Sequence, residues 1–257
     1  MEQSELTIKF DFNGEKEREA RLAPYGSTTA KEFSFPGKKI YVYVANWDDP
    51  EFADERSLKY RGRYFRGFHA PPQDMHELPD YLRRCVFQSQ STMLAFHHLV
   101  YIRNSTSVDR VPFVLTLSHE LQHATQYCSL PRILSANSLL HNHLARTIDP
   151  DTTLTPIDLP HEQDANIVSK RVAEKIFGNE AIETYAEEQI ERFRDHSGDR
   201  NARAEFVRWN FFRKCDASKA FDLKAKTIPF FEQFRSRINP QLARGFGLDI
   251  AKDQWWA

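Results

Sequence analysis

Cysteine is scarce in this sequence, and its placement excludes several classes of protein. Cys85, Cys128 and Cys215 form an odd and widely spaced set, which excludes a disulfide framework and any CxxC zinc or redox motif. The chain also lacks a run of about eighteen apolar residues, the length that a membrane-spanning helix needs. Its first residues contain no apolar signal segment, so we expect a cytoplasmic protein with no membrane partner.

Net charge is almost absent as well. The 35 Lys and Arg residues against 36 Asp and Glu residues leave a formal charge of −1, so no overall charge attracts nucleic acid. Aromatic residues are abundant, with 20 Phe, 9 Tyr and 4 Trp among 257 residues. A chain of this length and content can bury a large core, so we expect a folded enzyme or binding protein. Nothing in the pattern indicates its oligomeric state.

The N-terminal half predicts strands separated by irregular segments. Residues 39–45 (KIYVYVA) and 99–103 (LVYIR) have the β-branched and aromatic content of strands. The second of them is either an edge strand, to which an extended peptide could add as a further strand, or an ordinary strand of the sheet. Residues 1–30 predict a short edge strand followed by a loop, 46–80 predict loop, and 78–98 favour a helix.

Helices dominate the pattern from residue 111 onward. A polar connection is predicted over 129–158, and a second helix is expected to begin at Pro160 and end at Gly178. Asn179 is expected to begin a third helix, followed by two or three shorter ones. The first helix carries an apolar stripe with steps of three and four residues, at Val114, Leu117, Leu121, Ala124 and Cys128.

One motif in the first helix has the spacing of a metal site. His119-Glu120-Leu121-Gln122-His123 is an HExxH sequence, and residues four apart on a helix lie about 40° apart around its axis, so both imidazoles can reach one cation. Glu120 is turned by about 100° from His119, close enough to act on a metal-bound water without being a ligand. This pattern predicts Zn²⁺ bound by both histidines, with Glu120 as the catalytic base. Two histidines on a solvated helix face are the alternative.

A catalytic zinc needs a third protein ligand. A metzincin would have Gly at 126 and His at 129, where this chain has Gln126 and Ser129, so that class is excluded. A glutamate from the next helix is the other solution, and Glu162 with Asn166 forms an i, i+4 pair there. His141 and His143 remain alternatives to Glu162.

The two motifs together resemble those of a known group of enzymes. HELQH followed by EQDAN is similar to the paired motifs of gluzincin-type zinc metallopeptidases, and most similar locally to the ImmA/IrrE-like group, over residues 109–178. The resemblance implies a zincin-like α+β core: a small twisted sheet over the HExxH helix, with a cleft between an edge strand and the second ligand helix. It implies that His119, His123 and Glu162 bind zinc and that Asn166 orients a ligand imidazole. The chain has no helix-turn-helix segment, so cleavage of repressors is not implied.

The residue that stabilises the oxyanion is not fixed by any motif. Such peptidases usually place a Tyr, His or Arg there. Tyr127, Tyr185 and His196 are candidates, although each is also a common type of structural residue.

The C-terminal third is basic and aromatic. From Arg192 to Arg244 there are thirteen Lys and Arg residues against six Asp and Glu, a mixture that can bind nucleic acid. Phe206, Trp209 and Arg213 step by three and four, however, which favours aromatic packing in a helical subdomain. Trp255 and Trp256 either pack onto the body of the protein or fill a pocket of a partner. We therefore expect a metallopeptidase core over 1–196 and a helical extension over 197–257.

Two functions follow as hypotheses. The first is a zinc metallopeptidase that hydrolyses peptide or protein substrates with a Glu120-activated water. The second is a proteolytically silent zinc-binding module whose basic C-terminal part binds nucleic acid or a protein.

Overall fold

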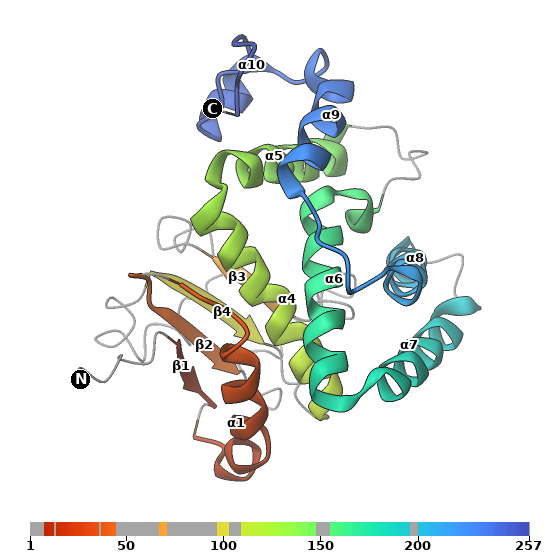
Figure 1. The fold of residues 1–257 in the computed structure, drawn as a ribbon. Helices are drawn as coiled ribbons and strands as arrows, with labels where there is room; N and C mark the ends of the chain where they lie inside the picture. Colours follow the sequence, from red (N-terminus) through yellow and green to blue (C-terminus); the bar gives the residue numbers. More distant parts are fainter. Residues whose placement is uncertain are drawn as a thin grey trace. The chain divides into compact units, whose positions relative to one another are not determined.

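The computed structural model describes residues 8–12, 14–35, 37–44, 67–70, 97–102, 109–147, 155–195 and 200–256. Over these residues the chain is α+β, with one four-stranded sheet and many helices (Figure 1), which confirms the expected class at that level. The finer expectation of a zincin core stays a prediction. The elements are β1 (Ile8–Asp11), α1 (Lys16–Ala30), β2 (Ile40–Val44), β3 (Gly67–Ala70), β4 (His98–Ile102), α4 (Arg110–Ser129), α5 (Pro131–Thr147), the 3₁₀ helix η4 (Pro156–Asp158), α6 (Pro160–Phe177), α7 (Asn179–Arg194), α8 (Arg200–Lys214), α9 (Leu223–Arg235) and α10 (Pro240–Gly245).

The chain divides into two compact units, and the helices α4 and α6 each contribute residues to both. The first unit comprises Met1–Thr125 and Ser169–Ile182, and the second comprises Gln126–Val168 and Glu183–Ala257. The predicted domain boundary at residue 196 falls in 196–199, outside the described residues, so the division into 1–196 and 197–257 stays a prediction.

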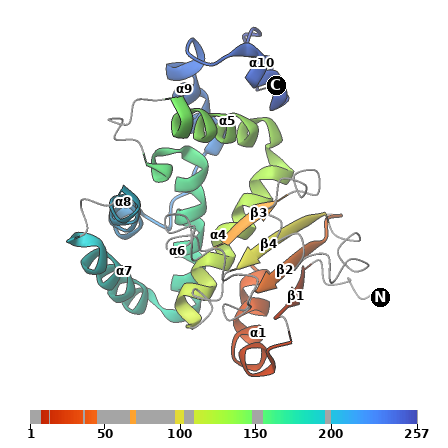
Figure 2. The same ribbon diagram turned by 180° about the vertical axis from the view of Figure 1, so that it is seen from behind.

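The sheet belongs to the first unit and has the strand order β1-β2-β4-β3, which Figure 2 shows from behind. β1, β2 and β4 run parallel, and β3 runs antiparallel to β4. All five residues of β2 and all five of β4 are buried. Because successive side chains point to opposite faces of a sheet, both faces are covered at these strands. The strands predicted over 39–45 and 99–103 are confirmed.

Of the two interpretations of the second strand, the structure supports an ordinary strand of the sheet and not an edge strand. β4 lies between β2 and β3, so it is not an edge strand. The edge next to it is β3, within a segment predicted as loop because of its prolines and charges. The helix predicted over 78–98 lies outside the described residues, except that His98 already belongs to β4.

The N-terminal segment contains a helix where the sequence predicts a loop. The predicted edge strand is β1, but residues Lys16–Ala30 form α1, with Pro24 inside it. Gly26 is the point of close approach to the sheet, since a Cβ there would lie 3.0 Å from the ring of Phe10. Packing against β1 therefore overrides the turn preference of Pro and Gly. At its far end, α1 is tied to α6 by Glu32, which accepts a hydrogen bond of 2.7 Å from Lys175.

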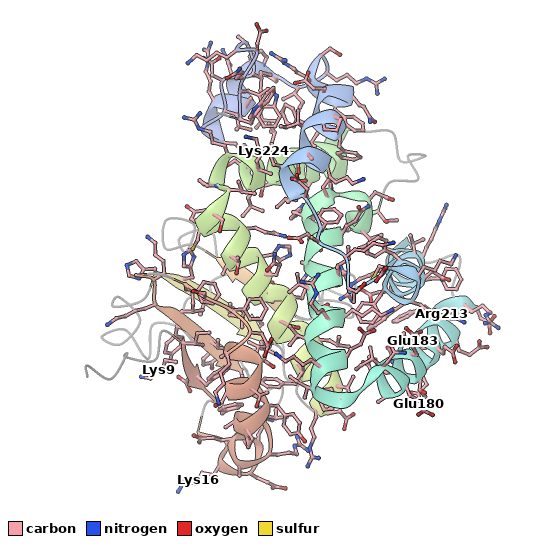
Figure 3. The ribbon with its side chains drawn as sticks, viewed as in Figure 1. Lys9, Lys16, Glu180, Glu183, Arg213 and Lys224 are labelled. Carbon is pink, nitrogen blue, oxygen red and sulfur yellow. The ribbon has the colours of Figure 1, made fainter. Side chains whose placement is uncertain are left out.

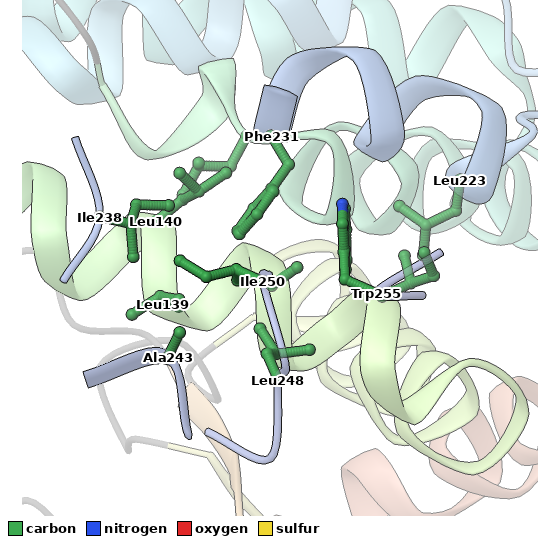
Figure 4. Close-up of a cluster of buried hydrophobic side chains, with 12 residues drawn as sticks. Leu139, Leu140, Leu223, Phe231, Ile238, Ala243, Leu248, Ile250 and Trp255 are labelled. Atoms are coloured by element: carbon green, nitrogen blue, oxygen red, sulfur yellow. The ribbon is translucent and has the colours of Figure 1, made fainter. Parts of the chain in front are cut away.

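The polar connection predicted over 129–158 was also wrong over most of its length, because α5 occupies Pro131–Thr147. One face of α5 is buried in a cluster with α9 and the chain after α10 (Figure 4). Asn137, the polar residue on that face, donates 2.9 Å hydrogen bonds to the Ile133 carbonyl and to Thr227 Oγ1. These bonds pair the amide nitrogen, whereas Asn137 Oδ1 is buried without a hydrogen-bond partner. A buried polar residue at this position weakens the apolar pattern of the helix in the sequence.

The later helices follow the sequence closely. α6 begins at Pro160 and ends before Gly178, whose φ of 87° is the left-handed conformation that glycine adopts freely. α7 begins at Asn179, and α8, α9 and α10 are the predicted shorter helices.

The C-terminal Trp255 packs against its own chain. It is 2% exposed, and its ring lies 4.3 Å from that of Phe231 between centroids. Among the described helices, none is both long and apolar enough to cross a membrane, and the cytoplasmic location stays a prediction.

Candidate metal centre

The HExxH sequence forms the middle of α4. Leu117 and Leu121 are fully buried and fix the orientation of this turn. His119 Nε2 and His123 Nε2 lie 3.1 Å apart, with the two rings nearly perpendicular at 87°. Two nitrogens that bind one tetrahedral zinc at 2.0–2.1 Å are separated by about 3.4 Å. The pair is therefore within a few tenths of an ångström of the spacing that chelates one ion.

The two acid–base groups of this turn are shielded from solvent. His119 is 9% exposed and Glu120 is 7% exposed, whereas His123 is half-buried. Every residue from Phe113 to Leu121 is buried, whereas Gln122 and His123 are half-buried, so Glu120 lies on the buried part of the turn. A carboxylate in such surroundings interacts with nearby charges more strongly than it would in water. His119 therefore does not lie on a solvated face, as the alternative interpretation of the motif requires, whereas His123 is partly accessible.

The apolar stripe of α4 is confirmed along most of its length. Val114, Leu117, Leu121 and Ala124 are all 0% exposed. Cys128 departs from the pattern, because it is exposed near the end of the helix. The core therefore supports α4 as far as the motif turn and not at its last turn.

Glu162 occupies the first turn of α6. Pro160 fixes the first helical position, and the Leu159 carbonyl accepts the backbone N–H of Glu162 at 3.0 Å. The side chain of Glu162 is 19% exposed. A carboxylate in the first turn of a helix is stabilised by the helix dipole, so an acidic residue suits this position.

A buried hydrogen-bond clamp joins the last turns of α4 to the first turn of α6. Gln126 Nε2 donates to the carbonyl of His161 at 2.9 Å and to Asp164 Oδ2 at 2.8 Å, and all three residues are at most 6% exposed. Gln126 follows His123 by three residues on α4, and Glu162 lies between its two partners in α6. The clamp therefore fixes the backbone around Glu162 relative to the turn that follows the HExxH sequence.

Within the described part of the second unit, one group of side chains has the composition and spacing of a metal site. It consists of His141, His161 and Glu162, whose ligand atoms lie within 4.8 Å of one another. His119 and His123 belong to the first unit and Glu162 to the second, so Glu162 as their third ligand stays a prediction. His141, an alternative third ligand in the sequence, is thus grouped with Glu162 and His161, and the side chain of His143 lies outside the described residues.

Asn166 supports the α6 turn from within its own helix. Its Nδ2 donates to the Glu162 carbonyl at 2.7 Å, and its Oδ1 accepts from Arg208 Nε at 3.0 Å. Arg208 is placed over the ring of Trp209 and pairs with Glu205 at 3.5 Å. The predicted contact of Asn166 with a ligand imidazole stays a prediction. Sequence reasoning missed Arg208, because the arginine is 42 residues away in another helix.

The three oxyanion candidates have different surroundings. Tyr185 on α7 packs edge-on against Trp209, with 5.6 Å between ring centroids. Tyr127 is half-buried on α4, one turn beyond His123. His196 lies outside the described residues. The role of oxyanion stabiliser therefore stays open among them.

The basic C-terminal segment uses its aromatic residues for packing. Trp209 and Phe212 are 0% and 1% exposed and contact each other at 5.1 Å between centroids. Arg213 and Lys224, both labelled in Figure 3, are exposed. Arg213 is paired with Glu187 at 3.1 Å. These two rings are therefore not displayed for stacking on bases.

Comparison with known proteins gives no relative: no family model, no curated protein and no solved structure matches the chain. The resemblance over residues 109–178 therefore stays an expectation from the two motifs. The functional argument depends on the chemistry of the residues themselves.

Proposed function

We propose that the chain is a zinc-dependent metallopeptidase in which His119, His123 and Glu162 hold the ion and Glu120 is the general base. The observation that carries the proposal is the 3.1 Å separation of the two Nε2 atoms beside a buried glutamate on the same turn. Two neutral imidazoles and a carboxylate are the ligand set of one class of catalytic zinc sites, which leave a further position open. In this proposal Glu162, the acidic residue in the first turn of α6, supplies the carboxylate of the set.

Each residue has a distinct role in hydrolysis. Bound zinc supplies a Lewis acid that polarises the substrate carbonyl and acidifies water. Glu120 accepts a proton from the attacking water and later donates it to the leaving amine. His119, His123 and Glu162 orient the ion. The Gln126 clamp and Asn166 hold the backbone of the turn that carries Glu162.

An extended peptide is the substrate class that this fold suits. Within the described residues, β3 is the outer strand beside β4 and runs antiparallel to it. An outer strand can pair its free backbone groups with an extended peptide, which presents its peptide bonds in a row. The proposed substrate is therefore an unstructured peptide or an unfolded protein segment.

The experiment has a metal arm and an activity arm. The His119→Ala variant is expected to lose the zinc of this site, measured by metal analysis of the purified chain. The Glu120→Gln variant is expected to keep that zinc and to lose about 10²–10⁴-fold in hydrolysis of an unfolded protein substrate. Glu188→Gln, an exposed change on α7, is the matched control and is expected to cleave at the wild-type rate.

The alternative function gives different results in the same experiment. A zinc-binding but silent module would lose zinc in His119→Ala and show no hydrolysis that Glu120→Gln alters. Retention on a nucleic-acid column that falls steeply with salt would then favour nucleic acid as the partner. The proposed peptidase requires a wild-type activity that Glu120→Gln removes.

A further inference from the structure

We propose that His141, His161 and Glu162 form a second divalent-cation site, which takes a borderline cation such as Zn²⁺ and shares Glu162 with the site proposed above. The three residues come from α5 and from the first turn of α6. The inference goes beyond the proposed peptidase, because it needs neither the HExxH histidines nor any hydrolytic activity.

The spacing of the ligand atoms fits one cation. His161 Nε2 and Glu162 Oε1 lie 3.6 Å apart, and all three ligand atoms fall within 4.8 Å of one another. Nitrogen and oxygen ligands bound to zinc at 2.0–2.2 Å in tetrahedral geometry are separated by about 3.4 Å. The pair on α6 is close to this separation, and the His141 nitrogen lies within 4.8 Å of both.

The backbone of the two α6 ligands is held before any ion binds. The His161 carbonyl accepts a hydrogen bond from Gln126 at 2.9 Å, and the Glu162 carbonyl accepts one from Asn166 at 2.7 Å. The backbone N–H of Glu162 donates to the Leu159 carbonyl at 3.0 Å. Ligand residues whose backbone is fixed in this way lose little conformational freedom when they bind a metal.

The third ligand is placed by the core of the second unit. Leu139 and Leu140 are both 0% exposed and insert into the α5–α9 cluster (Figure 4). His141 follows them directly and is exposed, because the next position on the helix turns away from that core. The site thus has one buried ligand, His161 at 6% exposed, and one that solvent reaches.

Sharing of Glu162 is chemically reasonable. A carboxylate has two oxygens and can offer one to each of two ions, and paired ions about 3.5–4 Å apart occur in aminopeptidases and nucleases. The negative charge of Glu162 also offsets the positive end of the α6 dipole, which would otherwise oppose a cation there. An ordinary ion pair between His161 and Glu162 is the competing explanation, and it would leave His141 with no effect on metal binding.

The test is zinc stoichiometry of the full-length chain after chelator treatment and titration with Zn²⁺ alone. The wild type is expected to bind two ions, and His141→Ala is expected to bind one, with affinity for the lost ion reduced by more than about 100-fold. His161→Ala is also expected to bind one ion, provided that its far-UV circular dichroism spectrum shows an unchanged fold. His97→Ala, which removes an imidazole from a described segment outside α5 and α6, is the control and should keep two ions.

The outcomes separate the two proposals. One ion in the wild type that His141→Ala leaves in place overturns the second site. Two ions that both persist in His141→Ala overturn it as well. Loss of one ion in His141→Ala together with no loss in His119→Ala would support the second site and overturn the peptidase.

Discussion

Two pairs of histidines in this molecule differ in what brings them together. His119 and His123 are four residues apart on one helix, so the helix itself sets the 3.1 Å between their Nε2 atoms. His141 and His161 belong to α5 and α6, and their grouping with Glu162 depends on how those helices pack. Residue spacing along one helix brings the first pair together, and the hydrophobic core that packs α5 brings the second pair together. Perturbing the core should therefore weaken the second pair and leave the first intact.

The largest expected effect comes from Phe231→Ala. Phe231 is 0% exposed in the cluster that holds α5, and removal of such a ring costs about 3–5 kcal/mol of unfolding free energy. The loosened α5 should weaken zinc binding at His141 while the ion at His119 and His123 remains. Urea unfolding and zinc titration measure the two effects.

Leu242→Ala is the control for this change, because Leu242 is 41% exposed on α10. It should alter stability by no more than about 0.5 kcal/mol. Equal losses of unfolding free energy in the two variants would show that the cluster does not hold α5 in place. Loss of both ions in Phe231→Ala would remove the contrast between the histidine pairs.

The buried His98, which belongs to neither pair, should make the unfolding free energy of the protein fall in acid. Burial, with smaller contributions from Lys38 and His97, lowers the pKa of His98 from 6.5 to about 4. Below pH 6.5 the unfolded chain binds a proton that the folded chain does not, so stability falls until about pH 4, where the folded chain is protonated as well. Urea unfolding of chelator-treated protein measures this slope without interference from bound metal.

The comparison variant for the acid sensitivity is His98→Gln. It should be less sensitive than wild type across the interval from pH 6.5 to 4, because the titrating imidazole has been removed. An identical slope in the two proteins would contradict the assignment of this sensitivity to His98.

Gln126→Met tests the clamp that serves both groups. The variant removes the donor to the His161 carbonyl and to Asp164, both buried, at an expected cost of about 1–3 kcal/mol. Zinc affinity should fall by about 10–100-fold, the usual effect of losing support for metal ligands. Calorimetric titration of zinc compares it with Gln233→Met, an exposed change on α9. Unchanged affinity in Gln126→Met would contradict the role of the clamp.

The smallest expected effect is at the start of α9. Asp222 caps this helix by accepting the Ala225 N–H at 2.9 Å, and Asp222→Ala should cost about 1 kcal/mol. Asp222→Asn retains a capping oxygen and should remain near wild type. Thermal unfolding of both variants measures the difference, and equal losses would show that charge rather than capping matters there.

Local patterns predicted the elements that local forces decide. The strands around Tyr41 and Tyr101, the limits of α6 and the HExxH helix were all visible in residue spacing. The wrong secondary-structure predictions share one cause, which is packing between distant segments of the chain. α1 contains Pro24 and Gly26 yet stays helical against Phe10.

The features of the candidate site also divide into those that local sequence predicts and those that depend on contacts between distant residues. The histidines of α4 and the first-turn position of Glu162 follow from the sequence, because helix geometry and Pro160 determine them. The Gln126–Asp164 clamp and the Arg208–Asn166 contact join residues 38 and 42 positions apart. No single-sequence pattern specifies pairings of that kind.

The central claim concerns which side chains surround one ion on α4. Anomalous diffraction at the zinc absorption edge, from crystals of the zinc-loaded full-length chain, locates the ion directly. We predict a peak within about 2.2 Å of His119 Nε2, His123 Nε2 and one oxygen of Glu162. No peak at the two imidazoles, or one with the Glu162 carboxylate turned away, would contradict the account.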